Sequence, residues 1–130
     1  MTYRKDFINF WRENELDFIV APGYVCPAVQ HGKAVNLTIL PCAYTYMWNA
    51  LDIPSCAMPV TLCKEDENYY ESVHNDVITD TLKEVMTGAE NLPMGVQVVS
   101  LPFQEEKILG LISSIEKDVG FYQKHPLPKI

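Results

Sequence analysis

Hydrophobic residues recur at helical spacing in four stretches of this chain. The spacing predicts helices over residues 2–15, 44–51, 76–86 and 104–119. The last of these keeps a 3.6-residue period of aliphatic side chains, and Gly120 follows it as a helix terminator. The chain therefore contains several amphipathic helices, each with one face to bury.

Shorter apolar stretches between these helices predict strands. Residues 16–21 end in a Pro–Gly turn, and residues 94–99 are rich in valine. Residues 56–62 also have strand character, although Pro59 cannot donate to a ladder there. Because strands alternate with helices, the pattern predicts an α/β fold with a partial, mainly parallel sheet and flanking helices.

Three further segments carry no strong periodicity. Residues 22–41 contain three prolines and two glycines and predict an irregular excursion. Residues 64–68 predict a charged loop, and the Pro-rich tail at 125–130 is expected on the surface. Three predicted strands leave open edges and faces to cover, so the sheet is expected to be part of a larger one.

Composition places the 130 residues in one globular domain, 1–130. Apolar residues make up 48% and charged residues 21%, while the net charge of −7 argues against nucleic acid or an anionic membrane as partner. No apolar run approaches the roughly 18 residues that a membrane span requires. The N-terminus lacks a secretory signal, and Met1 directly before a predicted helix favours a separate chain.

Candidate chemistry beyond the core is sparse. The four cysteines form no C-x-x-C pair and are expected to be free buried thiols in a reducing compartment. A Cys26–His31 nucleophile pair is a weaker alternative to a structural thiol and a loop histidine. Cys63 and His74 with acidic neighbours fit no zinc spacing, so no metal site and no cofactor is predicted.

Three ordered blocks resemble the C-terminal part of the amidase-signature family, nearest its fatty acid amide hydrolase branch. Residues 16–22 read LDFIVAP, and residues 49–54 read NALDIP before MPVT at 58–61. Residues 92–99 read LPMGVQVV and precede PFQEE at 102–106. The resemblance implies a portion of the amidase-signature fold covering nearly the whole chain.

Members of that family cleave amide bonds with a Ser–Ser–Lys set and a Gly-rich oxyanion loop, which lie N-terminal to the region that matches this chain. The resemblance therefore implies no catalytic residue here. The adjacent serines Ser113 and Ser114, with Lys117 one turn on, are expected to be solvent-facing positions of a regular helix. The resemblance also places Ile39, Cys42 and Ile78 near a substrate-channel wall, the last where mammalian enzymes carry a tryptophan.

Two functional hypotheses follow from the resemblance. The first is a non-catalytic, amidase-like subunit, a pseudoenzyme with a structural role among other protein chains. The second is the C-terminal chain of a split hydrolase of fatty acid amides, with Ser, Ser and Lys on another chain. A recruited subunit would fit an intracellular membrane complex, such as one in mitochondria, although the sequence carries no targeting signal for that compartment.

Aromatic pairs are candidate anchors for partner chains, because aromatic residues dominate interface hot spots. Tyr69–Tyr70 and Phe121–Tyr122 are such pairs. Trp48 is a third candidate, for which core packing is an equal alternative.

Overall fold

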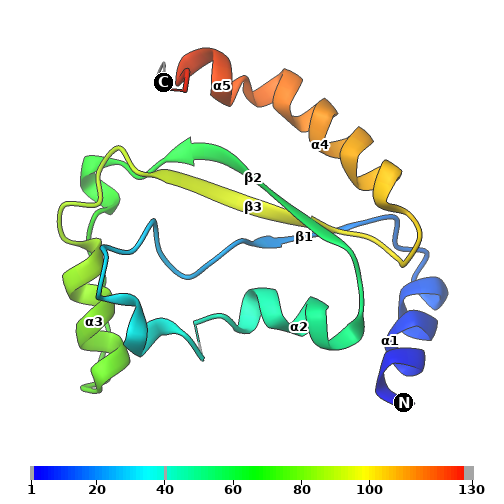
Figure 1. Ribbon diagram of the computed structural model, residues 1–130, viewed down its shortest axis with the longest axis horizontal. Coiled ribbons are helices and arrows are strands. Elements are labelled where there is room, and N and C mark those ends of the chain that lie inside the picture. The colour runs from blue at the N-terminus through cyan, green and yellow to red at the C-terminus, as the bar shows by residue number, and fades with distance from the viewer. Residues whose placement is uncertain (1, 40, 128–130) are drawn as a thin grey trace.

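The computed structural model describes residues 2–39 and 41–127. Helices alternate with three strands along the chain (Figure 1). The α-helices are α1 (Thr2–Glu13), α2 (Ala43–Leu51), α3 (Val77–Met86), α4 (Glu105–Val119) and α5 (Phe121–Lys124). The strands are β1 (Ile19–Pro22), β2 (Ser55–Leu62) and β3 (Pro93–Val99), and two short 3-10 helices are η1 (Ala34–Leu37) and η2 (Glu65–Glu67). The four predicted helices and three predicted strands are all present, whereas α5 was not predicted.

The sheet has the order β1-β3-β2, and both pairings are antiparallel. The α/β class is confirmed, but the expectation of a mainly parallel sheet was wrong for these pairings. β1 and β2 do run in the same direction, as a strand–helix–strand unit predicts. β3 lies between them in the opposite direction, so neighbouring strands are never parallel in this sheet.

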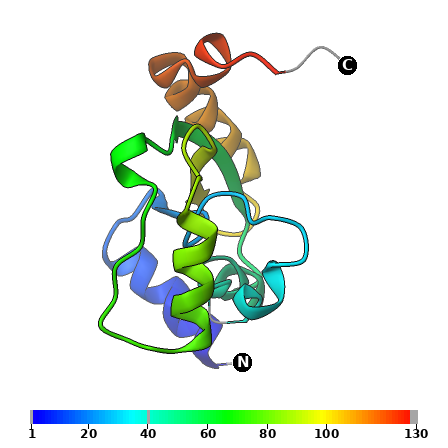
Figure 2. The same cartoon turned by 90° about the vertical axis from the view of Figure 1, so that its left-hand side faces the viewer.

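The position of α3 explains the direction of β3. α3 lies across one end of the sheet instead of over a face (Figure 2). The chain therefore re-enters the sheet at the end where it left. The backbone N–H of Asn91 donates to Cys63 O, and that of Cys63 donates to Leu92 O, each at 2.9 Å. Residues 63–92 thus form the long connection of a hairpin, which makes β3 antiparallel to β2.

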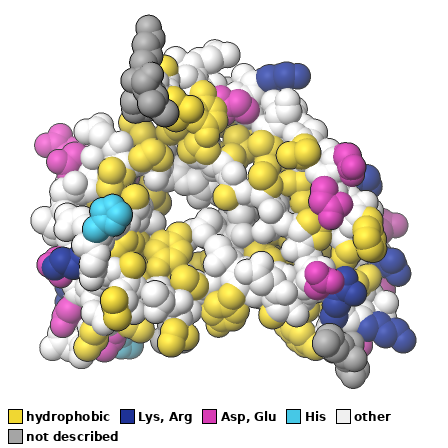
Figure 3. Space-filling view, viewed as in Figure 1, with side chains coloured by type: hydrophobic (Ala, Val, Ile, Leu, Met, Phe, Trp, Pro, Cys, Tyr) yellow, Lys and Arg dark blue, Asp and Glu magenta, His cyan; other side chains and the backbone are white. Residues whose placement is uncertain are grey.

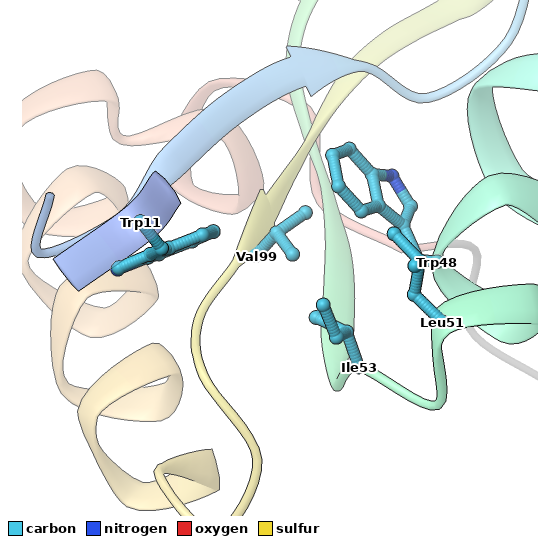
Figure 4. Packing of buried hydrophobic residues seen from close by; sticks show 5 residues of the cluster. All are labelled: Trp11, Trp48, Leu51, Ile53 and Val99. Atoms are coloured by element: carbon cyan, nitrogen blue, oxygen red, sulfur yellow. The ribbon is translucent and has the colours of Figure 1, made fainter. Parts of the chain in front are cut away.

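The main core lies on the face of the sheet that α1 and α2 cover. Trp11, Trp48, Leu51, Ile53 and Val99 are each at most 6% exposed and pack as one cluster (Figure 4). This burial supports the core-packing alternative for Trp48. The helical spacing of the aromatic residues in α1 places Trp11 in this cluster, which fixes α1 against the end of β3.

The opposite face of the sheet carries α4. Val98 is on the opposite side of β3 from Val99 because successive strand side chains alternate, and it is completely buried. Ile108 of α4 is also buried, and α4 packs on β2 and β3. Val20 of β1 remains 57% exposed, so this face is only partly covered.

The excursion predicted for residues 22–41 is irregular apart from η1. It packs on α3 through a second buried cluster of Cys26, Leu37, Leu82 and Val85. Asn36 Nδ2 donates to Thr81 Oγ1 at 3.1 Å. The excursion and α3 therefore form one packed unit at the end of the sheet.

The predicted C-terminal tail is described as far as residue 127. Residues 125–127 are exposed, as expected, and residues 128–130 lie outside the described part of the chain. Among the residues that the structure describes, no helix is both long and apolar enough to cross a membrane.

Candidate functional site

Two apolar hollows flank the excursion. The first, of about 440 Å³, lies between the start of the excursion, the middle of β2 and the first residues of β3. Figure 3 shows a hollow in this part of the molecule, bordered by hydrophobic side chains. Its walls include Tyr24, Val29, Met58, Pro59 and Met94. Such a surface offers van der Waals contact and few hydrogen bonds, which suits an apolar occupant.

Gly95 allows the sheet to form the floor of this hollow. A Cβ atom at Gly95 would lie 2.6 Å from Met58 O, too close for a side chain. The pairing of β2 with β3 is also irregular between Pro59 and Thr61. The proline that weakened the strand prediction therefore lies at a local break in the ladder, and β2 continues through it.

The side chain of Gln97 fastens both ends of the excursion to β3. Gln97 is 3% exposed, and its Nε2 donates to Pro22 O at 2.7 Å and to Tyr44 O at 2.5 Å. Pro22 ends β1, and Tyr44 lies in the first turn of α2. One amide group thus joins β1, α2 and β3 at the base of the excursion.

A polar cluster around Leu37 O fastens the excursion further from the sheet. Tyr24 Oη donates to Leu37 O at 2.6 Å, and Cys42 Sγ lies 3.7 Å from the same oxygen. Burial, with a smaller contribution from the nearby thiols of Cys42 and Cys26, raises the pKa of Tyr24 to about 12. The phenol therefore stays protonated and keeps its donor role at neutral pH.

The second hollow, of about 780 Å³, is open and lies between the excursion and the start of α3. Its lining is mainly apolar and includes Val25, Pro41, Ala43, Ile78 and Leu82. At its rim, Asp76 Oδ1 accepts from the backbone N–H groups of Ile78 and Thr79 and so caps α3. The bonds from the N–H and hydroxyl of Thr79, with a smaller contribution from the N–H of Ile78, lower the pKa of Asp76.

The structure places the three expected channel residues in different surroundings. Ile78 lines the second hollow and packs against the buried cluster. Cys42 is half-buried between two residues that line the same hollow, Pro41 and Ala43. Ile39 is 74% exposed and is not among the residues that line either hollow. The structure thus brings Cys42 and Ile78 towards one surface.

The other candidate groups do not assemble into a reactive centre. Ser113 and Ser114 are exposed positions of α4, as predicted. Cys26 is buried while His31 is exposed, and burial raises the pKa of the Cys26 thiol. In the described residues the four cysteines are free, and no group of three or more His, Cys, Asp or Glu side chains could hold a metal ion.

Sequence reasoning missed one feature of this region. Gln97 was part of a recognised motif, but its role as a link between three elements was not predicted. A glutamine within a valine-rich strand was the available signal, because a buried amide requires partners. Of the aromatic candidates, Tyr69 and Tyr70 are exposed in the connection between η2 and α3, whereas Phe121 is buried and Tyr122 exposed.

Comparison with known proteins shows the family of the chain. The family model described as Amidase matches residues 1–109. The chain is 32% identical to "Fatty acid amide hydrolase 1" of Caenorhabditis elegans and 33% identical to "Fatty-acid amide hydrolase 1" of Sus scrofa. Each alignment covers 88% of this chain and 20% of the relative. An "Amidase" of Gibberella moniliformis is 28% identical over 82% of the chain and 17% of the relative.

The chain belongs to the amidase family. The resemblance to its fatty acid amide hydrolase branch is confirmed at about one-third identity. The chain spans about a fifth of the length of the curated relatives it matches.

Proposed function

We propose that this chain is a non-catalytic, amidase-like subunit with a structural role in a larger multi-chain protein assembly. The observation that carries the proposal is the partly covered apolar surface around a three-stranded sheet. Val20 on the edge strand β1 is 57% exposed, and apolar hollows open on either side of the excursion. Extended apolar surface of this kind commonly marks a site where another protein or a ligand binds.

The chemical groups of the chain support a structural role. Its adjacent serines lie on the solvent side of a regular helix, and burial raises the pKa of the Cys26 thiol, which disfavours a thiolate nucleophile. A serine nucleophile needs an adjacent base and preorganised donors for the oxyanion. In this proposal the chain supplies sheet, scaffold and apolar wall, and other polypeptides cover its open faces.

A second candidate is supported by the hollow that Ile78 lines. In it, the chain forms part of the acyl-binding wall of a hydrolase of fatty acid amides whose Ser, Ser and Lys come from another polypeptide. Two of the matching relatives carry the name fatty acid amide hydrolase. The wall residues proposed here are Cys42, Ile78 and, on the resemblance alone, Ile39.

The test is purification of the full chain under mild conditions from cells that make it. Mass spectrometry identifies the co-purifying chains, and a fluorophosphonate probe reports an activated serine. Co-purification with other proteins and no labelling would support the structural unit. Labelling of a partner chain with a Gly–Ser–Ser motif would support the split hydrolase.

A double variant, Ser113→Ala with Ser114→Ala, is the matched control for the probe. Labelling of the assembly should be unchanged in this variant, since both serines are solvent-facing. Labelling of this chain that disappears in the double variant would refute both candidates. Recovery of the chain alone would refute the multi-chain assembly.

A further inference from the structure

The turn between β3 and α4 displays a phenylalanine almost entirely to solvent. Phe103 is 93% exposed and has a φ of 64°. A bulky side chain rarely adopts positive φ, because its Cβ crowds the backbone. An exposed phenylalanine in this conformation gains nothing from burial within the chain, so the strain needs another explanation.

The neighbouring residues hold the turn in this conformation. The backbone N–H of Ser100 donates to Pro54 O at 3.3 Å, and Ser100 Oγ donates to Gln104 Oε1 at 3.1 Å. Pro102 restricts its own φ, and Gln104 O accepts the first N–H bonds of α4. Both sides of Phe103 are therefore fixed, and the surrounding structure maintains the strain.

Two carboxylates, Asp52 and Glu105, line the same hollow as Phe103, and Glu106 is the next residue of α4. Glu105 and Glu106 are exposed in the first turn of α4, and the side chain of Asp52 is 91% exposed. The Arg4 guanidinium lies 3.4 Å from Asp52 and donates to Leu51 O at 2.7 Å, so it is already engaged. Phe103 and Pro102 thus form an apolar tip beside an acidic rim, next to a shallow hollow of about 360 Å³.

We propose that the Phe103 turn is an anchor that inserts into an apolar pocket with a Lys- or Arg-rich rim on the polypeptide completing the assembly. The inference rests on the proposed function and names the contact surface within it. A rigid aromatic side chain that enters an apolar pocket is typical of an interface hot spot. The acidic rim selects a basic partner surface and disfavours a second copy of this turn or an anionic bilayer.

The experiment uses photo-crosslinking in cells that make the protein. The full chain carries Phe103→p-benzoylphenylalanine, and the crosslinked peptide of the partner is identified by mass spectrometry. The same replacement at Val73, which is 97% exposed in the loop before α3, is the control position. We expect one partner peptide at position 103, apolar and flanked by Lys or Arg, and none in common at position 73.

Competition separates an anchor from mere proximity. Excess unlabelled chain should suppress the crosslink. The Phe103→Gly variant, in which glycine tolerates the positive φ, should suppress it to the same extent only at a concentration at least about 30-fold higher. Val73→Gly should compete like the unmodified chain. The Glu105→Gln, Glu106→Gln double variant and added salt should each weaken competition as well.

The outcomes distinguish the anchor from the proposed function. Equal competition by Phe103→Gly, or a crosslink to a second copy, to lipid or to a peptide without basic residues, would overturn the anchor. If the chain still co-purified with its partners in that case, the structural role would stand. If no partner protein were recovered with the chain at all, both would fail.

Discussion

The replacement of Gln97 by methionine tests how the excursion is held on the sheet. Gln97→Met keeps the length and approximate volume of the side chain and removes the Nε2 donor. The hydrogen bonds to Pro22 O and Tyr44 O, at 2.7 and 2.5 Å, are then lost together. Because Gln97 is 3% exposed, the rest of its packing is expected to remain.

The expected loss of stability is about 2 kcal/mol. Each hydrogen bond contributes about 0.5–1.5 kcal/mol net, and an acceptor left without a partner in the interior adds to the loss. Pro22 and Tyr44 are both exposed residues, so water can reach part of their surroundings and limits that addition. For a chain of 130 residues this loss corresponds to a decrease in Tm of about 6–10 °C.

Urea unfolding of the full chain, followed by tryptophan fluorescence, measures the free energy because Trp11 and Trp48 are both buried. Gln30→Met is the matched control, since Gln30 is an exposed residue of the same excursion. Hydrogen exchange should show faster exchange in residues 24–43 of Gln97→Met. A free energy of unfolding within about 0.5 kcal/mol of the control would refute the role assigned to the two bonds.

Three further changes test other features. Gly95→Ala should destabilise the chain by about 1–3 kcal/mol in urea unfolding, because the added Cβ would lie 2.6 Å from Met58 O. An unchanged unfolding midpoint would contradict that close approach. Asp76→Ala should lower Tm at pH 7 because the α3 cap is lost. Since the pKa of Asp76 is lowered in the folded chain, the difference in Tm between the two proteins should shrink as pH falls through that pKa. A difference in Tm that does not change with pH would refute the contribution of the ionised carboxylate. Subtracting the ultraviolet titration of Tyr24→Phe from that of the unmodified chain should show Tyr24 ionising with a pKa of about 12. Its contribution to stability should be lost as pH rises from about 10 to 12. Ionisation of Tyr24 near pH 10 in the folded chain would refute the assignment.

Local signals in the sequence were sufficient to predict most helices and strands. α3 begins after Asp76, which accepts two backbone N–H bonds, and α4 ends at Gly120, whose φ is 62°. Both are preferences of single residues for helix ends. The short helix α5 was missed because four residues are too few to show a period.

The direction of β3 could not be predicted from alternation alone. Alternating strands and helices imply parallel neighbours only where each helix crosses a face of the sheet. α3 lies across the end of the sheet, because its apolar side packs on Cys26 and Leu37 of the excursion. That packing joins residues distant in sequence, so no local pattern reveals it.

The candidate site shows the same division between local and long-range information. The resemblance indicated three wall positions. Of these, Ile78 lies on the apolar side of α3 and lines the second hollow. The resemblance did not indicate that Gln97 would bridge the two ends of the excursion. The two hydrogen bonds of Gln97 span 75 and 53 residues of sequence. The strain at Phe103 was equally hidden, because the residue carries no intrinsic preference for positive φ.

The polar bonds and the apolar surfaces of this protein have separable consequences. Gln97 and Tyr24 hold the excursion through hydrogen bonds to backbone carbonyls, so the walls of the hollows need not pack against each other. Removing these bonds should therefore reduce the stability of the chain itself. Val20 and Phe103 are 57% and 93% exposed, so truncating them should leave the unfolding of the chain nearly unchanged and weaken only the assembly. If the exposed residues instead affected the unfolding of the isolated chain as strongly as Gln97, the open surface would be serving this chain and not a partner.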